Sequence, residues 1–337
     1  MRGLVIMDKA ARLAYNRGMA EASGNHPGET VVAPVSAGRG YALVLLAAVL
    51  WATLGIIYTA LATAGLPPLG AAALRAGSGG LILLAGLLLL RPGWLRISRN
   101  AVIVILLYGS VGIAFFYAVY INAILMTGVA VAAVLLYTAP AWVALIAWRF
   151  LGESLTRSHG LALLLTLLGS ALVAQIYQPA VLRLNVAGIA LGLLSGFTYG
   201  LWSVFNKVGA RYANPWALQC YGLLTGCAVL LLLQPLAPLV AALRGGVHPG
   251  WLLALALGPT IGASVAYATG VRSVPVSVAS LIATVEPVVA AVLAFVVLHQ
   301  RLEAGQMAGG ALILLAVWLL RPRADKTLAN NKETIRL

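Results

Sequence analysis

The chain has 337 residues, of which 62% are hydrophobic and only 9% are charged, against roughly 25% charged residues in soluble domains. Its 22 basic and 8 acidic side chains cannot cover a water-facing surface of this size, which excludes a soluble enzyme, a disordered chain and a secreted disulfide scaffold. The net charge of +14 does not indicate nucleic-acid binding, because the basic residues lie mainly in tails and short connectors. Composition predicts an all-α polytopic membrane protein.

Ten stretches of the chain are apolar and long enough to cross a membrane, which takes about 20 residues of helix. Charged residues separate most of them, and the connector Gly65-Leu66-Pro67-Pro68 separates the first two, because proline interrupts a helix. The predicted spans of the first half are Tyr41–Leu61, Leu69–Leu90, Ala101–Ile121, Val129–Phe150 and His159–Tyr177. Those of the second half are Val186–Asn206, Pro215–Leu236, Trp251–Gly270, Val276–Leu298 and Ala304–Leu320.

The basic residues predict how these spans are oriented. With the N-terminus in the cytoplasm, 18 of the 22 basic residues fall in cytoplasmic segments, and only Arg183, Arg244 and Arg301 fall outside. Arg75 lies within the second span. Cytoplasmic loops are enriched in Lys and Arg, so we expect both termini in the cytoplasm.

The two halves of the chain resemble each other at a shift of 147 residues. Tyr120–Leu155 aligns without a gap with Tyr267–Leu302, and the mid-span prolines Pro140 and Pro287 coincide. A unit of five spans is odd, so its second copy must be inverted in the bilayer, which is the architecture of secondary transporters. The predicted organisation is a cytoplasmic tail (1–38), two five-helix repeats (39–180 and 181–322) and a second cytoplasmic tail (323–337).

Short motifs in both halves carry a family resemblance. They are Leu50-Trp51-Ala52, Leu74-Arg75, Pro140 with Leu151-Gly152-Glu153-Ser154-Leu155, and Glu286-Pro287 with Leu298 and Leu302. They resemble the EamA-type repeats of the drug/metabolite transporter superfamily, and Gly70-Ala71-Ala72-Ala73 is similar to its aromatic amino-acid exporters. The resemblance implies a ten-helix carrier of the bacterial inner membrane that exports amino acids or related metabolites. It also implies that spans 1–4 and 6–9 surround a central cavity while spans 5 and 10 brace the outside. The second Gly-Glu motif is replaced by His299-Gln300, so any role of that acid is not duplicated.

Two charged residues within spans are candidates for substrate binding. Glu286 is the only carboxylate well inside a span, and such residues are costly in lipid and often functional. It either binds substrate or donates, as a protonated acid, to the carbonyl that Pro287 frees near Ala283. Arg75 either extends to the membrane interface or binds a substrate carboxylate.

Aromatic residues at depth form the rest of the candidate substrate site, since they could bind apolar or aromatic solutes by stacking and through their hydroxyl groups. They are Trp51, Tyr58, Tyr120, Tyr137, Tyr199, Trp202 and Tyr267. Packing in the core is the competing interpretation for each of them.

A ridge of small residues and two prolines are the candidates for packing and hinge roles. Gly192, Gly196 and Gly200 continue a four-residue spacing that begins at Gly188, and this spacing lets another backbone approach closely. The ridge is either static packing or a sliding surface. Pro140 and Pro287 either kink their spans or act as hinges. Glu153 and Arg157 are spaced for a local salt bridge or cap.

These features favour a secondary transporter that exports small metabolites, amino acids above all, across the inner membrane by alternating access. A drug-cation/proton antiporter of the same superfamily is the main alternative. An integral-membrane enzyme is disfavoured, because the eight acids are scattered and neither HExxH, DxxxD nor a Gly-rich GK[ST] loop occurs. We expect no catalytic residues, metal or cofactor. The expected partners are a small-molecule substrate, lipid and, for an antiporter, protons, with the chain acting as a monomer or homodimer.

Overall fold

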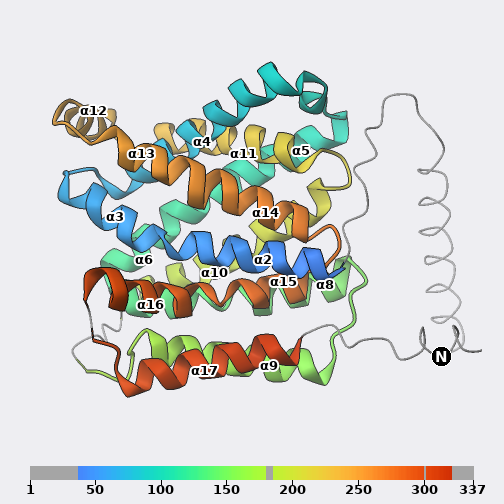
Figure 1. Ribbon diagram of the computed structural model, residues 1–337, viewed down its shortest axis with the longest axis vertical. Coiled ribbons are helices and arrows are strands. Elements are labelled where there is room, and N and C mark those ends of the chain that lie inside the picture. Colours follow the sequence, from blue (N-terminus) through green and yellow to red (C-terminus); the bar gives the residue numbers. More distant parts are fainter. Residues whose placement is uncertain (1–36, 180–184, 300, 321–337) are drawn as a thin grey trace, which may run out of the picture. The chain divides into compact units, whose positions relative to one another are not determined.

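The computed structural model describes residues 37–179, 185–299 and 301–320, and within these ranges the secondary structure is entirely helical. Apart from residues 37 and 38, the predicted tails 1–38 and 323–337 lie outside the described residues. The described helices belong to one compact unit that includes both halves of the sequence (Figure 1).

The helices follow the predicted stretches closely, with several spans made of more than one element. The first half contains α2 (Ala37–Ala52), α3 (Leu54–Thr63), α4 (Pro68–Leu90), η1 (Pro92–Leu95), α5 (Arg99–Leu107), η2 (Tyr108–Phe115), α6 (Phe116–Thr127), α7 (Val129–Leu136), α8 (Ala139–Phe150) and α9 (Arg157–Val173). The second half contains α10 (Val186–Gly209), α11 (Pro215–Leu232), α12 (Leu236–Arg244), α13 (Pro249–Leu255), η3 (Ala256–Gly262), α14 (Ala263–Gly270), α15 (Val276–Ala283), α16 (Glu286–Leu298) and α17 (Ala304–Leu319).

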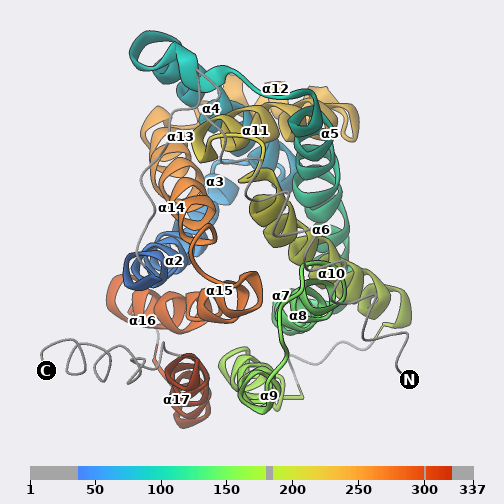
Figure 2. The ribbon, with the colours of Figure 1, turned by 90° about the vertical axis from the view of Figure 1, so that its right-hand side faces the viewer.

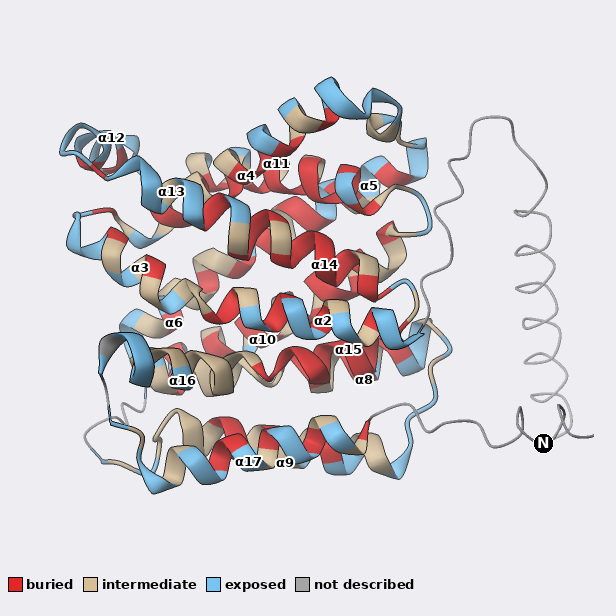
Figure 3. Cartoon of the chain, in the orientation of Figure 1, coloured by how far each residue is buried: buried red, intermediate tan, exposed pale blue. Residues whose placement is uncertain are grey.

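Eight helical stretches of the described chain are long and apolar enough to cross a membrane. The predicted fifth and tenth spans correspond to α9 and α17, which are apolar but shorter, at 17 and 16 residues. Large apolar side chains remain exposed on the outside of the helices, among them Val186 at 86% and Leu232 at 85% exposure (Figure 3). A surface of this kind suits lipid rather than water. The prediction of an all-α polytopic membrane protein is confirmed.

The predicted seventh span is too long at its end. It was expected to run to Leu236, but α11 stops at Leu232 and a separate short helix, α12, begins at Leu236. Pro235 precedes α12 and has no N–H to continue the hydrogen-bond ladder of α11.

Five of the predicted spans consist of more than one helical segment. The first span divides into α2 and α3 at Thr53. The fourth span divides into α7 and α8 just before Pro140, and the ninth divides into α15 and α16 just before Pro287. The third and eighth spans instead contain the π-helical segments η2 and η3, and η3 includes Pro259. Because proline cannot donate to the preceding turn, the helix restarts near Pro140 and Pro287 and widens at Pro259. η2 contains no proline.

The starts of several helices recur at the shift of 147 residues seen in the sequence. The pairs of starts are Pro68 and Pro215, Phe116 and Ala263, Val129 and Val276, Ala139 and Glu286, and Arg157 and Ala304. The two halves therefore repeat the same helix order and the same broken fourth helix.

Two helices lie apart from the others. α9 and α17 pack on each other, beside the pairs α7–α8 and α15–α16 (Figure 2). At the centre of the bundle α14 and α15 are almost wholly buried, as Figure 3 shows. The core of the protein thus lies among the spans that the sequence places first to fourth and sixth to ninth.

The glycine ridge of α10 faces the broken fourth span. A Cβ added at Gly196 would lie 2.7 Å from the carbonyl oxygen of Leu135, and one at Gly192 would lie 2.5 Å from the Leu135 side chain. At Gly200 the space is wider, since the carbonyl oxygen of Ala139 is 3.3 Å away. α10 therefore contacts the helix break most closely at Gly196.

The sequence-based pairing of Glu153 with Arg157 is wrong. Among the described residues Glu153 forms no ion pair with Arg157, and its carboxylate accepts hydrogen bonds from Val276 and Ser277 at the start of α15. Two unpaired backbone N–H groups stabilise a carboxylate more than an exposed arginine does.

Candidate functional site

A cavity of about 440 Å³ lies between the helices of both halves. Its lining comes from spans 1–4 and 6–9, whereas the described residues of α9 and α17 do not contribute to it. This is the arrangement that the family resemblance implies. The lining includes Ala62 and Pro68 where α3 meets α4, and Ile124 and Val129 where α6 meets α7, so the cavity extends toward that end of the bundle.

Aromatic rings form a continuous wall of the cavity. Trp202 packs edge-on against Trp51 at 5.4 Å between ring centroids and stacks on Tyr199 at 5.9 Å. Tyr199 in turn contacts Phe116 at 5.3 Å, and Phe116 stacks on Tyr120 at 5.7 Å. The wall offers flat apolar faces to a solute, and contacts of this type are worth about 0.5–1.5 kcal/mol beyond the buried area.

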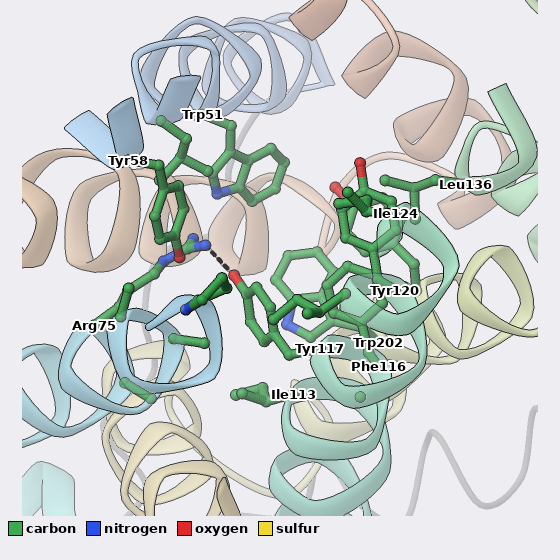
Figure 4. A pocket seen from close by; sticks show the side chains of 18 of the residues that line it. Trp51, Tyr58, Arg75, Ile113, Phe116, Tyr117, Tyr120, Ile124, Leu136 and Trp202 are labelled. Carbon is green, nitrogen blue, oxygen red and sulfur yellow. Dashed lines mark hydrogen bonds between the residues drawn. The ribbon is translucent and has the colours of Figure 1, made fainter. Parts of the chain in front are cut away.

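Arg75 is held in place by three other residues. Its Nε donates to Thr260 Oγ1 at 3.0 Å, its Nη2 donates to the carbonyl oxygen of Pro259 at 3.1 Å, and its Nη1 donates to the hydroxyl of Tyr117. A guanidinium has five N–H groups, and these bonds use three of them. Figure 4 shows the Tyr58 hydroxyl pointing toward the same guanidinium, and this buried hydroxyl has no hydrogen-bond partner among the described residues.

The π-helical segment η3 provides the acceptors for Arg75. Proline at position 259 leaves the carbonyl of Leu255 without its usual donor, and Thr260 Oγ1 donates to that carbonyl at 2.6 Å. The hydroxyl oxygen of Thr260 then accepts from Arg75. The π-helical segment of the eighth span thus fixes Arg75 of the second span.

Glu286 lines the same cavity, and its carboxylate forms no hydrogen bond or ion pair with the described residues. The predicted hydrogen bond to the carbonyl of Ala283 is absent among the described residues, and the role of Glu286 stays a prediction. The reason lies in the helix break: Glu286 begins α16, and its side chain leaves the turn that contains Ala283 for the cavity. Glu286 also lines a second cavity of about 10 Å³, whose hydroxyl-bearing residues include Ser280 and Thr284.

A buried polar chain fixes the Trp202 ring. Trp202 Nε1 donates to the Tyr108 hydroxyl at 2.8 Å, and Tyr108 donates to Gln219 Oε1 at 2.5 Å. Gln219 Nε2 donates to Asn206 Oδ1 at 2.7 Å, and Asn206 Nδ2 donates to the Trp202 carbonyl at 2.9 Å. Such satisfied networks make a core rigid, so the aromatic wall is preorganised.

Eight of the nine residues predicted to bind substrate line the cavity of about 440 Å³. They are Trp51, Tyr58, Arg75, Tyr120, Tyr137, Tyr199, Trp202 and Glu286. The ninth, Tyr267, is 1% exposed, lines only the smaller cavity and donates to Ser203 Oγ at 3.0 Å. It packs against Trp202 at 4.9 Å, which is the packing role that competed with binding.

Sequence reasoning missed Tyr117, Thr260 and Tyr108. Tyr117 lies one helical turn before Tyr120 and therefore on the same face of α6, so a count of helix faces would have found it. Thr260 and Tyr108 gain their roles from partners 94 or more positions away in the chain, and no local signal identifies them.

These features define a membrane transporter: apolar spans from two repeated halves enclose a cavity of solute size with two charged residues inside it. The sequence model of the EamA-like transporter family matches twice, over residues 38–175 and 186–321. The chain belongs to this family, and the resemblance drawn from its short motifs is confirmed.

Two relatives agree with this membership, and a solved structure shares the fold. An uncharacterized transporter of Archaeoglobus fulgidus is 34% identical over 202 residues, which covers 59% of this chain and 70% of that protein. The uncharacterized transporter YwfM of Bacillus subtilis is 27% identical over 299 residues, covering 86% and 97% of the two chains. A solved structure described only as "Crystal structure of protein" has a TM-score of 0.69 and 19% identity, covering 84% of this chain and 96% of that one. This last likeness shows the fold alone.

Proposed function

We propose that this transporter is a secondary carrier that exports small amino-bearing metabolites, amino acids above all, by alternating access. In this proposal α9 and α17 complete ten spans, the two repeats are inverted in the bacterial inner membrane, and both termini are cytoplasmic. The repeated helix starts and the family membership support the architecture.

The presence of Arg75 and Glu286 in one otherwise apolar cavity carries the proposal. A zwitterion needs a cationic and an anionic partner, and the guanidinium of Arg75 and the carboxylate of Glu286 supply them. The aromatic wall suits an apolar or aromatic side chain. The cavity volume lies within the range of about 300–1,000 Å³ that is usual for small-molecule sites.

An organic-cation/proton antiporter is the second candidate function, and one observation favours it. Three of the N–H groups of Arg75 already bind protein, whereas Glu286 binds none of the described residues. If Arg75 is purely structural, the cavity presents only an acid and aromatic rings, which bind cations.

Flux of a matched pair of solutes through purified protein in liposomes tests these alternatives. Tryptophan and tryptamine share the indole and the amino group, and only tryptophan has a carboxylate. We expect saturable tryptophan counterflow, with tryptamine at least about tenfold slower because it leaves Arg75 unpaired. Faster flux of tryptamine, coupled to an opposing proton flux, would instead support the antiporter.

A cavity-filling variant tests whether the cavity is the transport site. Gly55 lines it, and a Cβ at this position would meet no atom within 4 Å, so Gly55→Leu adds bulk to the cavity from a position with open space around its Cβ. We expect flux to fall by at least about tenfold while thermal stability is unchanged. Gly86→Leu on α4 is the control, because Gly86 is equally unobstructed and lies outside the cavity lining. Normal flux in Gly55→Leu would move the transport site elsewhere.

Cysteine labelling tests the orientation. In a background without Cys220 and Cys227, Ser98→Cys at the start of α5 and Ala241→Cys on α12 place single thiols at opposite ends of the spans. In intact cells an impermeant maleimide should label Cys at 241 and should reach Cys at 98 only after permeabilisation. The reverse pattern would contradict cytoplasmic termini.

A further inference from the structure

Glu153 connects the two halves of the chain. Its Oε1 accepts from the backbone N–H of Val276 at 2.7 Å, and its Oε2 accepts from the backbone N–H of Ser277 at 3.1 Å and from the Ser277 hydroxyl at 2.5 Å. The first N–H groups of a helix lack partners within it and carry partial positive charge. A residue that follows the fourth span thus caps the first half of the ninth.

Lys207 binds the other side of the same connection. Its Nζ donates to the carbonyl oxygen of Val271 at 2.6 Å and to that of Val274 at 2.9 Å. These carbonyls lie between the end of α14 and the start of α15, where the helix ladder leaves acceptors free. The connector 271–277 therefore binds two side chains, Glu153 of the first half of the chain and Lys207 of the second half.

The contacts of Glu153 and of Lys207 lie at one end of the bundle, and the cavity extends toward the opposite end. The cavity reaches the junctions α3–α4 and α6–α7, whereas Glu153 and Lys207 lie where α8, α10 and α14 end and α15 begins. Between the cavity and these contacts the bundle is tightly packed: residues 276–285 are all buried. The second cavity, of about 10 Å³, lies in this region.

The sequence repeat does not duplicate these contacts. At the shift of 147 residues the counterparts of Glu153, Ser277 and Lys207 are Gln300, Ala130 and Ala60. The set of residues related to the contacts by the repeat thus lacks the carboxylate, the hydroxyl and the ammonium group. In an inverted repeat these counterparts would close the opposite end.

We propose that Glu153 and Lys207 form a one-sided latch, which keeps the cytoplasmic end closed and makes the outward-open state the resting state. Glu153 and Lys207 are positioning residues that set the balance between the two open states, and their hydrogen bonds to the connector 271–277 break in every transport cycle. This inference rests on the proposed alternating access. It assigns a function to the Gly-Glu motif at Gly152-Glu153, which the second repeat lacks at the matching position.

Accessibility of a cysteine behind the latch tests the proposal without a substrate. Ser280 lines the second cavity and is 6% exposed, so Ser280→Cys, without the native cysteines, reports on opening from the cytoplasmic side. In inside-out vesicles we expect Glu153→Gln and Lys207→Gln each to raise its maleimide labelling rate about tenfold, because charge-assisted hydrogen bonds are lost. A thiol placed at Gly55 should label more slowly from the outer side in the same variants.

Arg157→Gln is the matched control, because Arg157 is an exposed charge just after Glu153 and lies outside the latch. If Glu153→Gln fails to fold, Ser277→Ala removes one of the three bonds to Glu153 and should give a smaller rise. Unchanged labelling in folded latch variants, or an equal rise in Arg157→Gln, would overturn the latch. Absence of flux in the wild type would contradict the proposed function and leave the labelling result intact, so the two failures are distinguishable.

Discussion

Glu286→Gln is expected to fold normally and to lose at least about tenfold in flux. The carboxylate lines the cavity and accepts no hydrogen bond from the described residues, and the positive charge of Arg75 acts on it there. A bound amino group or a transported proton would stabilise it further. The amide keeps the size of the side chain and removes its negative charge. Loss of a charge-assisted hydrogen bond alone costs roughly 1.5–3 kcal/mol, which is at least about tenfold in binding.

The measurement is liposome flux at two pH values with tryptophan and tryptamine, for the wild type and the variant. If Glu286 carries a proton, the pH dependence of flux should disappear with the acid. Glu303→Gln is the matched control, because this acid caps α17 at the surface and binds Tyr177 and Gln178 outside the cavity. Full flux in Glu286→Gln would show that the carboxyl group has a purely structural role.

Hydropathy predicted the positions of the spans well. It did not predict the helix breaks and π-helical segments within them. Charges and Gly-Pro connectors placed the helix starts within a few residues, because the cost of burying charge in lipid acts locally along the chain. The breaks before Pro140 and Pro287 depend on whether a proline restarts or merely kinks a helix, and neighbouring helices decide this. The π-helical η2 contains no proline, so no residue in it marks the widening.

Depth and residue type were enough to predict most of the aromatic and charged residues of the cavity lining, because few such residues occur within the spans. Helical spacing could not show which partner each residue finds. Arg75 binds residues 42, 184 and 185 positions away, and Glu153 caps a helix 123 positions away. Contacts between distant spans follow from packing of the whole bundle. Spacing along the chain therefore could not show that Tyr267 contacts Ser203 or that Glu153 caps α15.

Gly196→Leu is expected to destabilise the protein and to abolish flux. A Cβ at this position would collide with the Thr138 hydroxyl and lie 2.7 Å from the carbonyl oxygen of Leu135. Both groups belong to the break between α7 and α8, where the backbone is already interrupted, so neither can move away without disturbing Tyr137 in the cavity wall. Overpacking typically costs about 1–3 kcal/mol, and a leucine against backbone should reach the upper part of that range.

Smaller substitutions along the glycine ridge distinguish static packing from a sliding surface. Gly196→Ala should be milder than Gly196→Leu, and Gly200→Ala milder still, because its Cβ would lie 3.3 Å from the nearest atoms. Gly160→Leu on α9 is the control, since a Cβ there meets nothing within 4 Å. Thermal unfolding followed by size-exclusion chromatography, together with liposome flux, gives both readouts.

If the ridge slides during alternating access, Gly200→Ala should slow flux without lowering the unfolding temperature. If the ridge is static packing, flux and stability should fall together along the series. Normal flux and stability in Gly196→Leu would contradict the close contact between α10 and the broken fourth span.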